Sequence, residues 1–540
     1  MLKGGMIAMN NRLGDRIKNL IWPIVYLSVI TGFLSAIIIT AFKLATRDAI
    51  YLSTSFYQMI RDYPIWLPML VIGAALIGLV ASFILSATHS CRGGGIPTSV
   101  AAIRGIVSFK WYAGAFILPI SALMTFFCGL PLGTEGPCVQ MGTAVGDGVV
   151  KCVGAKKHKG WRRYIMTGGA SAGFSIATSS PITAIIFSME ELHKHFSPLL
   201  LMIASLSVVI AQSTAQVLAM LGLGSVRLFE LPVIPAADVK LLFAPVIIGL
   251  VCGVCSILFT RFYRIVDKIM RRLLKKISAS IVFPVLFGAV ALVGFFIADS
   301  LGTGHSLAEV LFHREIVWYM MILLFLIRAI TMMISNTSGV TGGIFLPTIS
   351  FGAILGALSA EMMIAFGWIG EDLYMLMVCL GITAFLGATS RIPITAGVFA
   401  VEALGGINNI LAIIIAVTVS FLVVELASID DFTDTVIEAK ARSITKGKKP
   451  VVIEVPLTVG EGSFVIGKEL KDILWPNSCV VVSFDYVHKA REEHCIVPGD
   501  VITVRYTTYD PIATADDIRI LVGEQSEEVE NTLRHPAEAI

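Results

Sequence analysis

The stretch "GTEGPCVQMGTAVGDGV", Gly133–Val149, is the part of the chain from which the rest is best interpreted. It places one carboxylate, Glu135, in a run of Gly and Pro with no basic neighbour, inside strongly apolar sequence. Burying an unpaired charge in apolar surroundings is costly. Glu135 therefore needs compensation from its surroundings, and it is a candidate functional residue.

A second stretch has the same pattern. "GGIFLPTISFGAILGAL", Gly342–Leu358, also places a Gly-rich loop and a Pro before a helix of small residues. A second pair, Gly168–Leu192 and Leu380–Leu404, shares a break followed closely by Pro-Ile-Thr-Ala and a helix ending in Glu. Two pairs in the same order predict homologous halves, about residues 20–223 and 240–427, with substrate bound between them at the middle of the membrane.

The composition predicts a polytopic membrane protein. Of 540 residues, 56% are hydrophobic and only 15% are charged, whereas soluble domains are about one quarter charged. Runs long enough to cross a bilayer are Ile21–Ala41, Trp66–Leu85, Tyr112–Leu130, Pro198–Leu223, Leu241–Phe259, Phe283–Ile297, Trp318–Ile334 and Leu411–Val424. Segments cut by Gly or Pro, expected to be short, broken or re-entrant helices, are Thr167–Phe187, Gly343–Leu358 and Leu373–Ala396.

Basic clusters set the expected orientation. Lys156–Arg163 and Arg271–Lys276, with the basic N-terminus 1–19, are assigned to the cytoplasm by the positive-inside rule. We expect a multi-pass protein of the plasma (inner) membrane with both termini cytoplasmic. The net charge of +3 then reflects topology rather than nucleic-acid binding.

The sequence does not indicate an enzyme. Its nine cysteines are scattered, and the pair Cys252–Cys255 lies in an apolar run without His or acidic ligands, which favours helix packing. We expect no metal site, no disulfide framework and no cofactor. No phosphate-binding loop or nucleophile triad is recognisable, so enzyme hypotheses have no support.

After Ala427 the composition becomes polar and charged. Four short segments with the alternation of strands follow: "VVIEVPL", "CVVVSFDYV", "VITVRYTT" and "IRILVG". We expect a linker at 443–450, a small α+β cytoplasmic domain at 451–523, and an acidic, poorly ordered tail at 524–540.

Three Gly-rich segments stand at expected helix starts: "GGGIP" (Gly93–Pro97), "GTEGP" (Gly133–Pro137) and "GGIFLP" (Gly342–Pro347). A helix start exposes backbone N–H groups and the positive end of the peptide dipole. Converging starts can therefore bind an anion without Lys or Arg, and weakly enough to release it. Any single segment of this kind more often serves only to break or pack a membrane helix.

From about Leu20 to Arg442 these motifs resemble the CLC family of chloride channels and proton-coupled chloride transporters. "GGGIP" is similar to its GSGIP, "GTEGPCVQMG" to its GREGPxVQxG, "PITAIIFSMEEL" to its segment ending in an acidic pair, and "GGIFLP" to its GxFxP. The resemblance implies an all-α polytopic membrane protein with two inverted structural repeats and re-entrant helices. It also implies a homodimer with a separate chloride pathway in each subunit.

The resemblance also implies roles for single residues. Glu135 corresponds to the gating glutamate, which accepts a proton and competes with the anion, and Glu191 to the internal acid that passes protons. Glu190 is expected to be structural, and Glu402 is expected to be a structural or dimer-region residue. The positions that would surround the anion are Gly94, Gly95, Ile96, Gly136, the backbone of Ile344 and Phe345, and Phe432.

The sequence departs from the family pattern at three positions. Gly94 stands where the family has an anion-coordinating serine, and Phe432 is the best match to its tyrosine, so both side-chain donors are missing. Thr134 replaces the arginine beside the gating acid. Weaker discrimination among chloride, bromide and nitrate, and looser coupling to protons, would follow.

The soluble segment resembles the TrkA-type C-terminal subdomain of potassium-conductance regulators. Residues at the positions of its pattern are Gly462, Gly467, Lys468, Leu470, Gly499 and Asp500. The resemblance implies a module that dimerises and binds a small ligand that the sequence does not identify. The alternative is a dimer clamp without a ligand.

Chloride/proton antiport through Glu135 and Glu191 is the function that these observations favour. A passive, voltage- or pH-gated anion channel on the same scaffold stays open because of Gly94 and Phe432. A third hypothesis is a ligand sensor whose soluble tail gates an anion leak.

Overall fold

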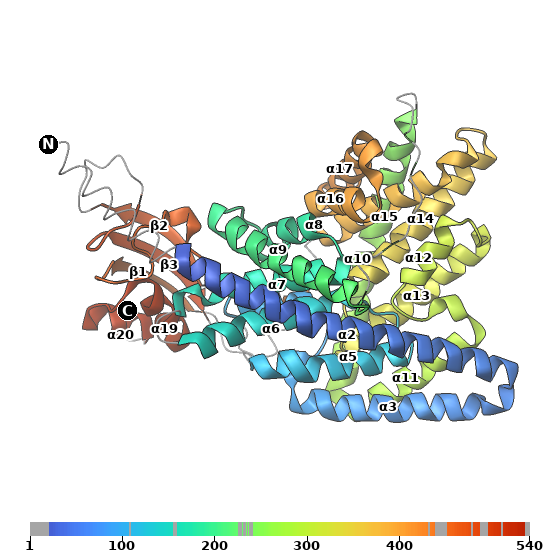
Figure 1. Ribbon diagram of the computed structural model, residues 1–540, viewed down its shortest axis with the longest axis horizontal. Helices are drawn as coiled ribbons and strands as arrows, with labels where there is room; N and C mark the ends of the chain where they lie inside the picture. Colours follow the sequence, from blue (N-terminus) through green and yellow to red (C-terminus); the bar gives the residue numbers. More distant parts are fainter. Residues whose placement is uncertain are drawn as a thin grey trace.

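The computed structural model describes residues 21–106, 110–154, 159–224, 229, 234, 236, 241–429, 433–437, 451–476, 479–486, 495–508 and 511–534. A large helical part is joined by a small β-containing domain, red in Figure 1, which lies against one end of it. The N-terminal segment 1–19, the linker 443–450 and Phe432 lie outside the described residues.

The helices of the first half are α2 (Trp22–Asp62), α3 (Leu67–Ala87), α4 (Gly95–Ile103), α5 (Leu118–Phe127), α6 (Glu135–Gly154), α7 (Arg162–Thr178), α8 (Pro181–Phe187) and α9 (Pro198–Met220). Those of the second half are α10 (Phe243–Lys276), α11 (Ala279–Phe296), α12 (His305–Phe312), α13 (Trp318–Ser338), α14 (Phe345–Ala365), α15 (Tyr374–Ser390), α16 (Pro393–Ala403) and α17 (Ile410–Leu426).

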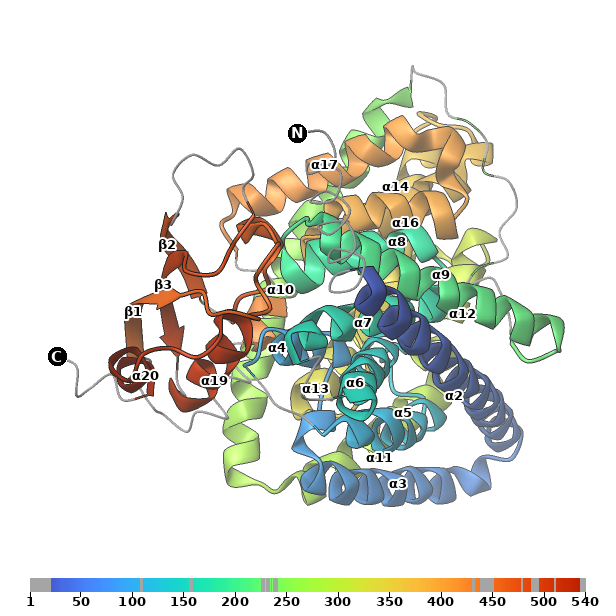
Figure 2. The same ribbon diagram turned by 60° about the vertical axis from the view of Figure 1, so that its left-hand side comes forward.

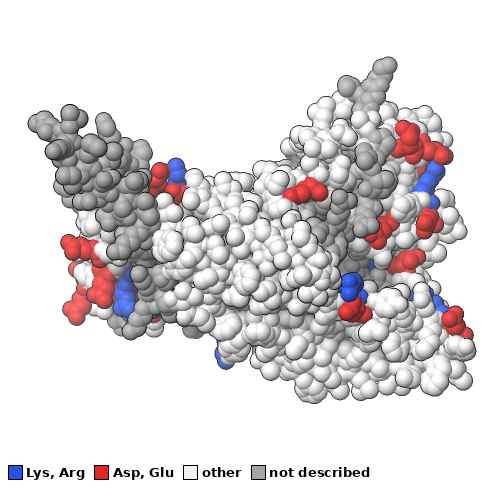
Figure 3. Space-filling model, viewed as in Figure 1, with Lys and Arg blue, Asp and Glu red and all other residues white. Residues whose placement is uncertain are grey.

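In the part of the chain that the structure describes, nine helical segments are long and apolar enough to cross a membrane. On the face shown in Figure 3, charged side chains gather mostly toward the two ends, and the middle is almost uniformly uncharged. This distribution is that of a multi-pass membrane protein, because the hydrocarbon core admits few charges.

Two of the expected segments differ from the structure in whether the helix is continuous. The stretch Tyr112–Leu130, expected to be one helix, begins with a π-helical turn at Ala113–Ile117, and α5 then starts next to Pro119. Proline removes a backbone donor, which accounts for the irregular turn. The stretch Gly343–Leu358, expected to be broken, forms the uninterrupted helix α14 after its Gly-rich start.

The two halves are structurally equivalent, as predicted. Ser179 follows α7 and Arg391 follows α15, and both are left-handed, with φ of 55° and 54°. The next helix in each half begins with Pro. The halves meet in an antiparallel bridge between Gly133 and Gly343. Because the equivalent segments lie antiparallel there, the repeats are inverted.

Glycines set the close packing inside each half. A Cβ atom on Gly142 of α6 would lie 2.0 Å from the carbonyl oxygen of Gly169 on α7. In the second half, a Cβ atom on Gly381 of α15 would lie 2.4 Å from the carbonyl oxygen of Gly352 on α14. Any side chain at these positions would push the paired helices apart.

The soluble domain contains the strands β1 (Val451–Thr458), β2 (Cys479–Asp485) and β3 (Val501–Thr508) in the antiparallel order β1-β3-β2. The prediction of a fourth strand at "IRILVG" is wrong, because all of these residues except the final Gly523 belong to helix α19 (Pro511–Val522). Ala515, Ile518 and Val522 are buried at helical spacing, and that period of three to four residues outweighs the apolar run.

The acidic tail is also more ordered than expected. Its residues Glu527–Arg534 form helix α20. Leu533 is buried, and Arg534 contacts Asp516 of α19 at 2.9 Å. Acidic residues in the first turn and a basic residue in the last turn stabilise the helix dipole.

The soluble domain docks on the start of α7. The Arg163 guanidinium lies 2.5 Å from the Asp517 carboxylate, and the Tyr164 hydroxyl donates to the carbonyl of Asp472 (2.5 Å). The Trp161 and Phe464 rings meet edge to face at 5.0 Å. Figure 2 shows the domain beside this end of the helical part.

Candidate anion and proton pathway

Three helix starts converge between the two halves. Helices α4, α6 and α14 begin at Gly95, Glu135 and Phe345, each with proline as its third residue. The N–H of Gly133 donates to the carbonyl of Gly343, and the reverse bond also forms, both at 2.7 Å. The positive ends of two helices from different halves are thereby held side by side.

Glycine is required for this approach. A Cβ atom on Gly95 would lie 1.9 Å from the carbonyl oxygen of Gly136, and one on Gly136 would lie 2.8 Å from the Cα of Gly343. A side chain at either position would separate the helix starts. The structure thus brings together the predicted positions Gly95 and Gly136.

The residue just before each helix is partly exposed, although its neighbours on both sides are buried. This residue is Gly94 before α4, Thr134 before α6 and Ile344 before α14. Accessible surface therefore reaches all three helix starts. Backbone N–H groups in the first turn have no partner within the helix, so an anion arriving there would meet donors.

The Glu135 side chain is fully buried among these starts. Its carboxylate turns back over Gly133, where an added Cβ would lie 2.5 Å from Oε2. Its own N–H, the Leu346 N–H and the Thr134 hydroxyl interact with it, but neither oxygen has a hydrogen bond of regular geometry with a described residue. The carboxylate thus lies in the field of α14 without being tightly bound.

Leu346 was missed by the sequence analysis, which assigned backbone contacts only to Ile344 and Phe345. The signal was present, because Leu346 is the last residue before the proline in "GGIFLP" and so carries the last free N–H before it. The Leu346 N–H interacts with Glu135.

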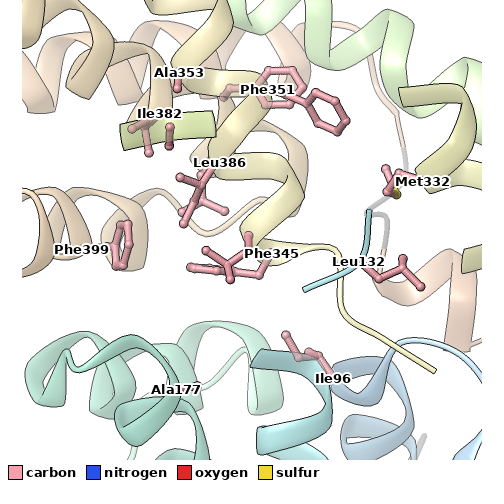
Figure 4. Packing of buried hydrophobic residues seen from close by; sticks show 14 of the residues in the cluster. Ile96, Leu132, Ala177, Met332, Phe345, Phe351, Ala353, Ile382, Leu386 and Phe399 are labelled. Atoms are coloured by element: carbon pink, nitrogen blue, oxygen red, sulfur yellow. The ribbon is translucent and has the colours of Figure 1, made fainter. Parts of the chain in front are cut away.

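Apolar side chains line the interior next to these starts. Figure 4 shows Phe345 at the start of α14 near Leu386 and Phe399, with Ile96 of α4 across from it. The Phe345 ring contacts Phe174 of α7 at 5.1 Å and Phe399 of α16 at 5.7 Å. Gly94, Ile344 and Phe345 thus offer a passing ion backbone groups and apolar surface, without any charge of their own.

Asn336 of α13 is a second polar residue that the sequence analysis missed. The Tyr263 hydroxyl donates to its Oδ1 at 2.7 Å, which turns its Nδ2 toward the carbonyl of Gly342 (3.5 Å). A Cβ atom on Gly94 would lie 3.3 Å from that Nδ2. An amide donor therefore stands beside the position where Gly94 lacks a side chain.

Glu191 lies in a π-helical turn after α8 and is buried. The hydroxyl of Thr433 donates to its Oε1. Asp434, the next residue, contacts Lys194 at 2.5 Å and Arg104 at 3.4 Å. The segment 433–437, which follows α17, is thus fixed against Glu191. Phe432 lies outside the described residues.

The neighbourhoods of the two acids are connected by aromatic rings. Phe345, next to Leu346, contacts Phe174, and Phe174 stacks on Phe187 of α8 at 4.2 Å with an angle of 8° between the rings. Phe187 lies four residues before Glu191. A proton passing between the acids along this row would need water molecules, because the rings cannot carry it.

Glu190 and Glu402 have a different environment. Glu190 accepts the backbone N–H groups of Ile394 (3.0 Å) and Thr395 (2.7 Å) at the start of α16. Reciprocally, Glu402 accepts those of Ile182 (2.9 Å) and Thr183 (2.8 Å) at the start of α8. Each acid caps the helix of the other half, which supports a structural role for both.

Metal binding has no support in the described residues, where no group of three or more His, Cys, Asp or Glu side chains could hold an ion.

Comparisons with known proteins agree with this architecture. A sequence model of the voltage gated chloride channel family matches residues 73–425. The H(+)/Cl(−) exchange transporter ClcA of Vibrio campbellii is 25% identical over 415 residues, which are 75% of this chain and 87% of that protein.

Solved structures share the fold. The crystal structure of a slow cyanobacterial Cl−/H+ antiporter has a TM-score of 0.70 at 20% identity, covering 77% of this chain and 98% of that one. A eukaryotic CLC transporter has a TM-score of 0.63 at 17% identity, covering 78% and 74%. Because the family match spans well over half of the chain and includes the three converging helix starts, this chain belongs to the voltage gated chloride channel (CLC) family.

Proposed function

We propose that this protein exchanges chloride for protons across the membrane, with Glu135 as the external gate and proton acceptor and Glu191 as the internal proton-transfer acid. The observation that carries the proposal is the buried Glu135 carboxylate, which lies at the start of α14 without a regular hydrogen bond to a described residue. A carboxylate that lies in the field of helix dipoles without a regular hydrogen bond can be replaced by another anion.

The exchange follows because the Glu135 carboxylate and chloride compete for the same helix dipoles. While ionised, Glu135 occupies the place that the first-turn N–H groups offer to an anion. When a proton neutralises the carboxylate, its attraction to the dipoles weakens and chloride takes the place. Return of the carboxylate expels the anion and releases the proton, so that the two ions move in opposite directions.

Chloride would be held by backbone groups around Gly94, Gly95, Ile96, Gly136, Ile344 and Phe345, with Phe432 as an inner constriction. The convergence of α4, α6 and α14 supports these assignments. The Asn336 amide is a side-chain donor close to Gly94, and it would supply part of what the missing hydroxyl does not.

On the inner side, Glu191 would exchange protons with the cytoplasm. Its position under Thr433 at the cytoplasmic end of α8, and its aromatic connection toward the start of α14, support this role. Relatives named as H(+)/Cl(−) exchange transporters add support.

A liposome experiment tests the exchange. Purified protein is reconstituted, and an imposed chloride gradient is followed with a pH indicator. We expect uphill proton movement driven by chloride. Rapid anion flux without proton movement in the wild type would contradict antiport and favour the alternative, a passive, voltage- or pH-gated anion channel. That alternative rests on the lack of a side-chain donor at both Gly94 and Phe432.

We further propose that the soluble domain is a TrkA-C-like regulatory module. Gly462, Gly467 and Gly499 of its pattern have φ values of 77°, 74° and 88°, which suit tight turns. Lys468 donates to the carbonyl of Phe464 and lies 5.1 Å from the Trp161 ring, at the contact with the membrane part. Burial there lowers the pKa of Lys468 to about 8.

Truncation after Arg442 tests this role. A regulatory module predicts a change in flux or in its response to small molecules. If flux and response are unchanged and only assembly is affected, the domain is a dimer clamp, which is the alternative.

The protein is proposed to be a homodimer in the plasma (inner) membrane, with cytoplasmic termini. Exposed apolar side chains such as Ile182 on α8 and Ile394 on α16 offer a surface for a second copy. Light scattering of the detergent-solubilised protein tests the dimer, and protease access to the soluble domain in oriented vesicles tests the orientation.

A further inference from the structure

Lys43 is a basic residue inside the long apolar helix α2, where a charge needs a specific partner. Its ammonium group donates to the carbonyl of Ile176, in the last turn of α7, at 2.7 Å. Electrostatic interactions connect it with Glu135 and Cys138, which lie one turn apart at the start of α6. Three helices thus meet at this lysine.

The packing of α2, α6 and α7 places these groups at one level. A Cβ atom on Gly169 of α7 would lie 2.1 Å from the Gly142 carbonyl oxygen and 3.2 Å from Thr31 of α2. One turn further along α7, a Cβ atom on Gly173 would lie 2.3 Å from the Cys138 carbonyl oxygen and 3.3 Å from Ile39.

The next turn of each helix continues this register. On α7 the next turn leads from Gly173 to Ile176, and on α2 it leads from Ile39 to Lys43. Helix α6 runs the other way, so its next turn leads from Cys138 back to Glu135. The bond between Lys43 and Ile176 closes this layer. The close packing of α2, α6 and α7 around Gly169 and Gly173 therefore fixes the Lys43 ammonium group beside the start of α6.

The loop before Glu135 supplies no such charge, because the stretch from Cys128 to Gly136 contains neither Lys nor Arg. Thr134, next to the acid, has only a hydroxyl. Lys43 is partly exposed as a residue, and its ammonium group is bonded to the carbonyl of Ile176. It is therefore placed to act on anions that approach Glu135 as well as on Glu135 itself.

We propose that Lys43 is a positioning residue for exchange, which holds the Glu135 carboxylate in place and raises the local concentration of chloride at the outer opening of the pathway. This inference rests on the proposed function, because it takes Glu135 as the gate. The outer side is the one away from the soluble domain, since that domain contacts the opposite end of α7 through Arg163.

The test varies chloride on each side of reconstituted, oriented membranes. With Lys43→Gln, we expect the KM for outer chloride to rise by about three- to tenfold, with little change in the maximal rate or in the KM for inner chloride. Lys43→Arg should retain the wild-type value. Arg47→Gln is the matched control, because Arg47 lies one turn further along α2, is exposed and pairs with Asp48 at 3.0 Å.

A relocated charge separates electrostatics from helix capping. The double variant Lys43→Gln/Thr134→Arg restores a positive charge beside Glu135 but not the bond to Ile176, and it should recover most of the outer KM. If the double variant stays at the value of Lys43→Gln, or if Lys43→Gln lowers only thermal stability, Lys43 merely caps α7 and the proposal is overturned.

Thr134→Arg alone decides the question if Lys43→Gln does not fold. A second positive charge should lower the outer KM, and an unchanged KM would overturn the proposal. These outcomes are independent of the proposed antiport. A wild type that moves chloride without protons contradicts antiport while leaving the effect of Lys43 on KM measurable, and a coupled wild type insensitive to Lys43→Gln contradicts only this inference.

Discussion

The membrane part contains two pairs of acids that differ in whether the other repeat has an acid at the equivalent position. Glu190 and Glu402 occupy equivalent positions of the two repeats, and each accepts N–H groups from the helix start of the other half. Glu135 and Glu191 have no acidic counterparts, because the equivalent positions are Phe345 and Ala403. The symmetric acids each cap a helix of the other half, and in the proposed function the asymmetric acids take part in transport.

This difference shows how a protein built from inverted repeats can present different groups to the two sides of the membrane. Symmetry alone would give both halves the same groups and an identical environment from either side. With phenylalanine and alanine at the equivalent positions, one carboxylate lies at the start of α6 and another in the turn that follows α8. The proposed proton route from one side of the membrane to the other uses both carboxylates.

The largest expected effect is that of Glu135→Gln, which keeps the shape and removes the titratable group. Proton flux in liposomes should fall about 100-fold or more, to background, while anion flux persists. Asp147→Asn on the same helix is the control. Asp147 is buried but paired with Lys151 (2.7 Å) and Arg162 (2.6 Å), so its loss should reduce stability and leave coupling intact.

The capping acids should affect stability instead. Glu190→Gln and Glu402→Gln each weaken N–H contacts at a helix start, and each should destabilise the protein by about 1–2 kcal/mol. Thermal unfolding in detergent measures this as a lower Tm. Because the two sites are equivalent, similar shifts are expected. A large shift in Tm at one site only would show that the two caps do not contribute equally to stability.

A smaller effect is expected at Thr433. The variant Thr433→Val removes the hydroxyl that donates to Glu191 and should slow proton flux roughly two- to fivefold, as expected for one hydrogen bond worth about 1 kcal/mol. Chloride flux should not change. Thr214→Val serves as the control, since its hydroxyl bonds within α9 at 2.8 Å. Equal proton flux in both variants would contradict a role of Thr433 in proton transfer.

Local patterns predicted much of this site. The three helix starts and Glu135 follow from Gly and Pro at fixed spacing, which determine backbone conformation within a few residues. The repeats were visible for the same reason. The reciprocal caps were not, because Glu190 reaches a helix start more than 200 residues away along the chain, and no local pattern predicts such a contact.

Lys43 shows a second reason for failure. The first apolar run ends near Ala41 in the sequence, so Lys43 falls outside the expected span, whereas α2 continues to Asp62. Its neighbours in space come from α6 and α7, and only glycine-mediated packing of three helices brings them together. In the soluble domain, "IRILVG" has the composition of a strand, but packing against the sheet selects a helix.

Glu190 and Glu191 allow the most direct test of the difference between the symmetric and the asymmetric acids, because they are adjacent and can receive the same substitution. The measurement is the ratio of protons to chloride ions moved, in liposomes that contain Glu190→Gln or Glu191→Gln. We expect Glu190→Gln to keep the wild-type ratio and Glu191→Gln to reduce it to nearly zero while chloride still flows. Loss of coupling in both variants, or in neither, would contradict the assignment of the symmetric acids to structure and the asymmetric acids to transport.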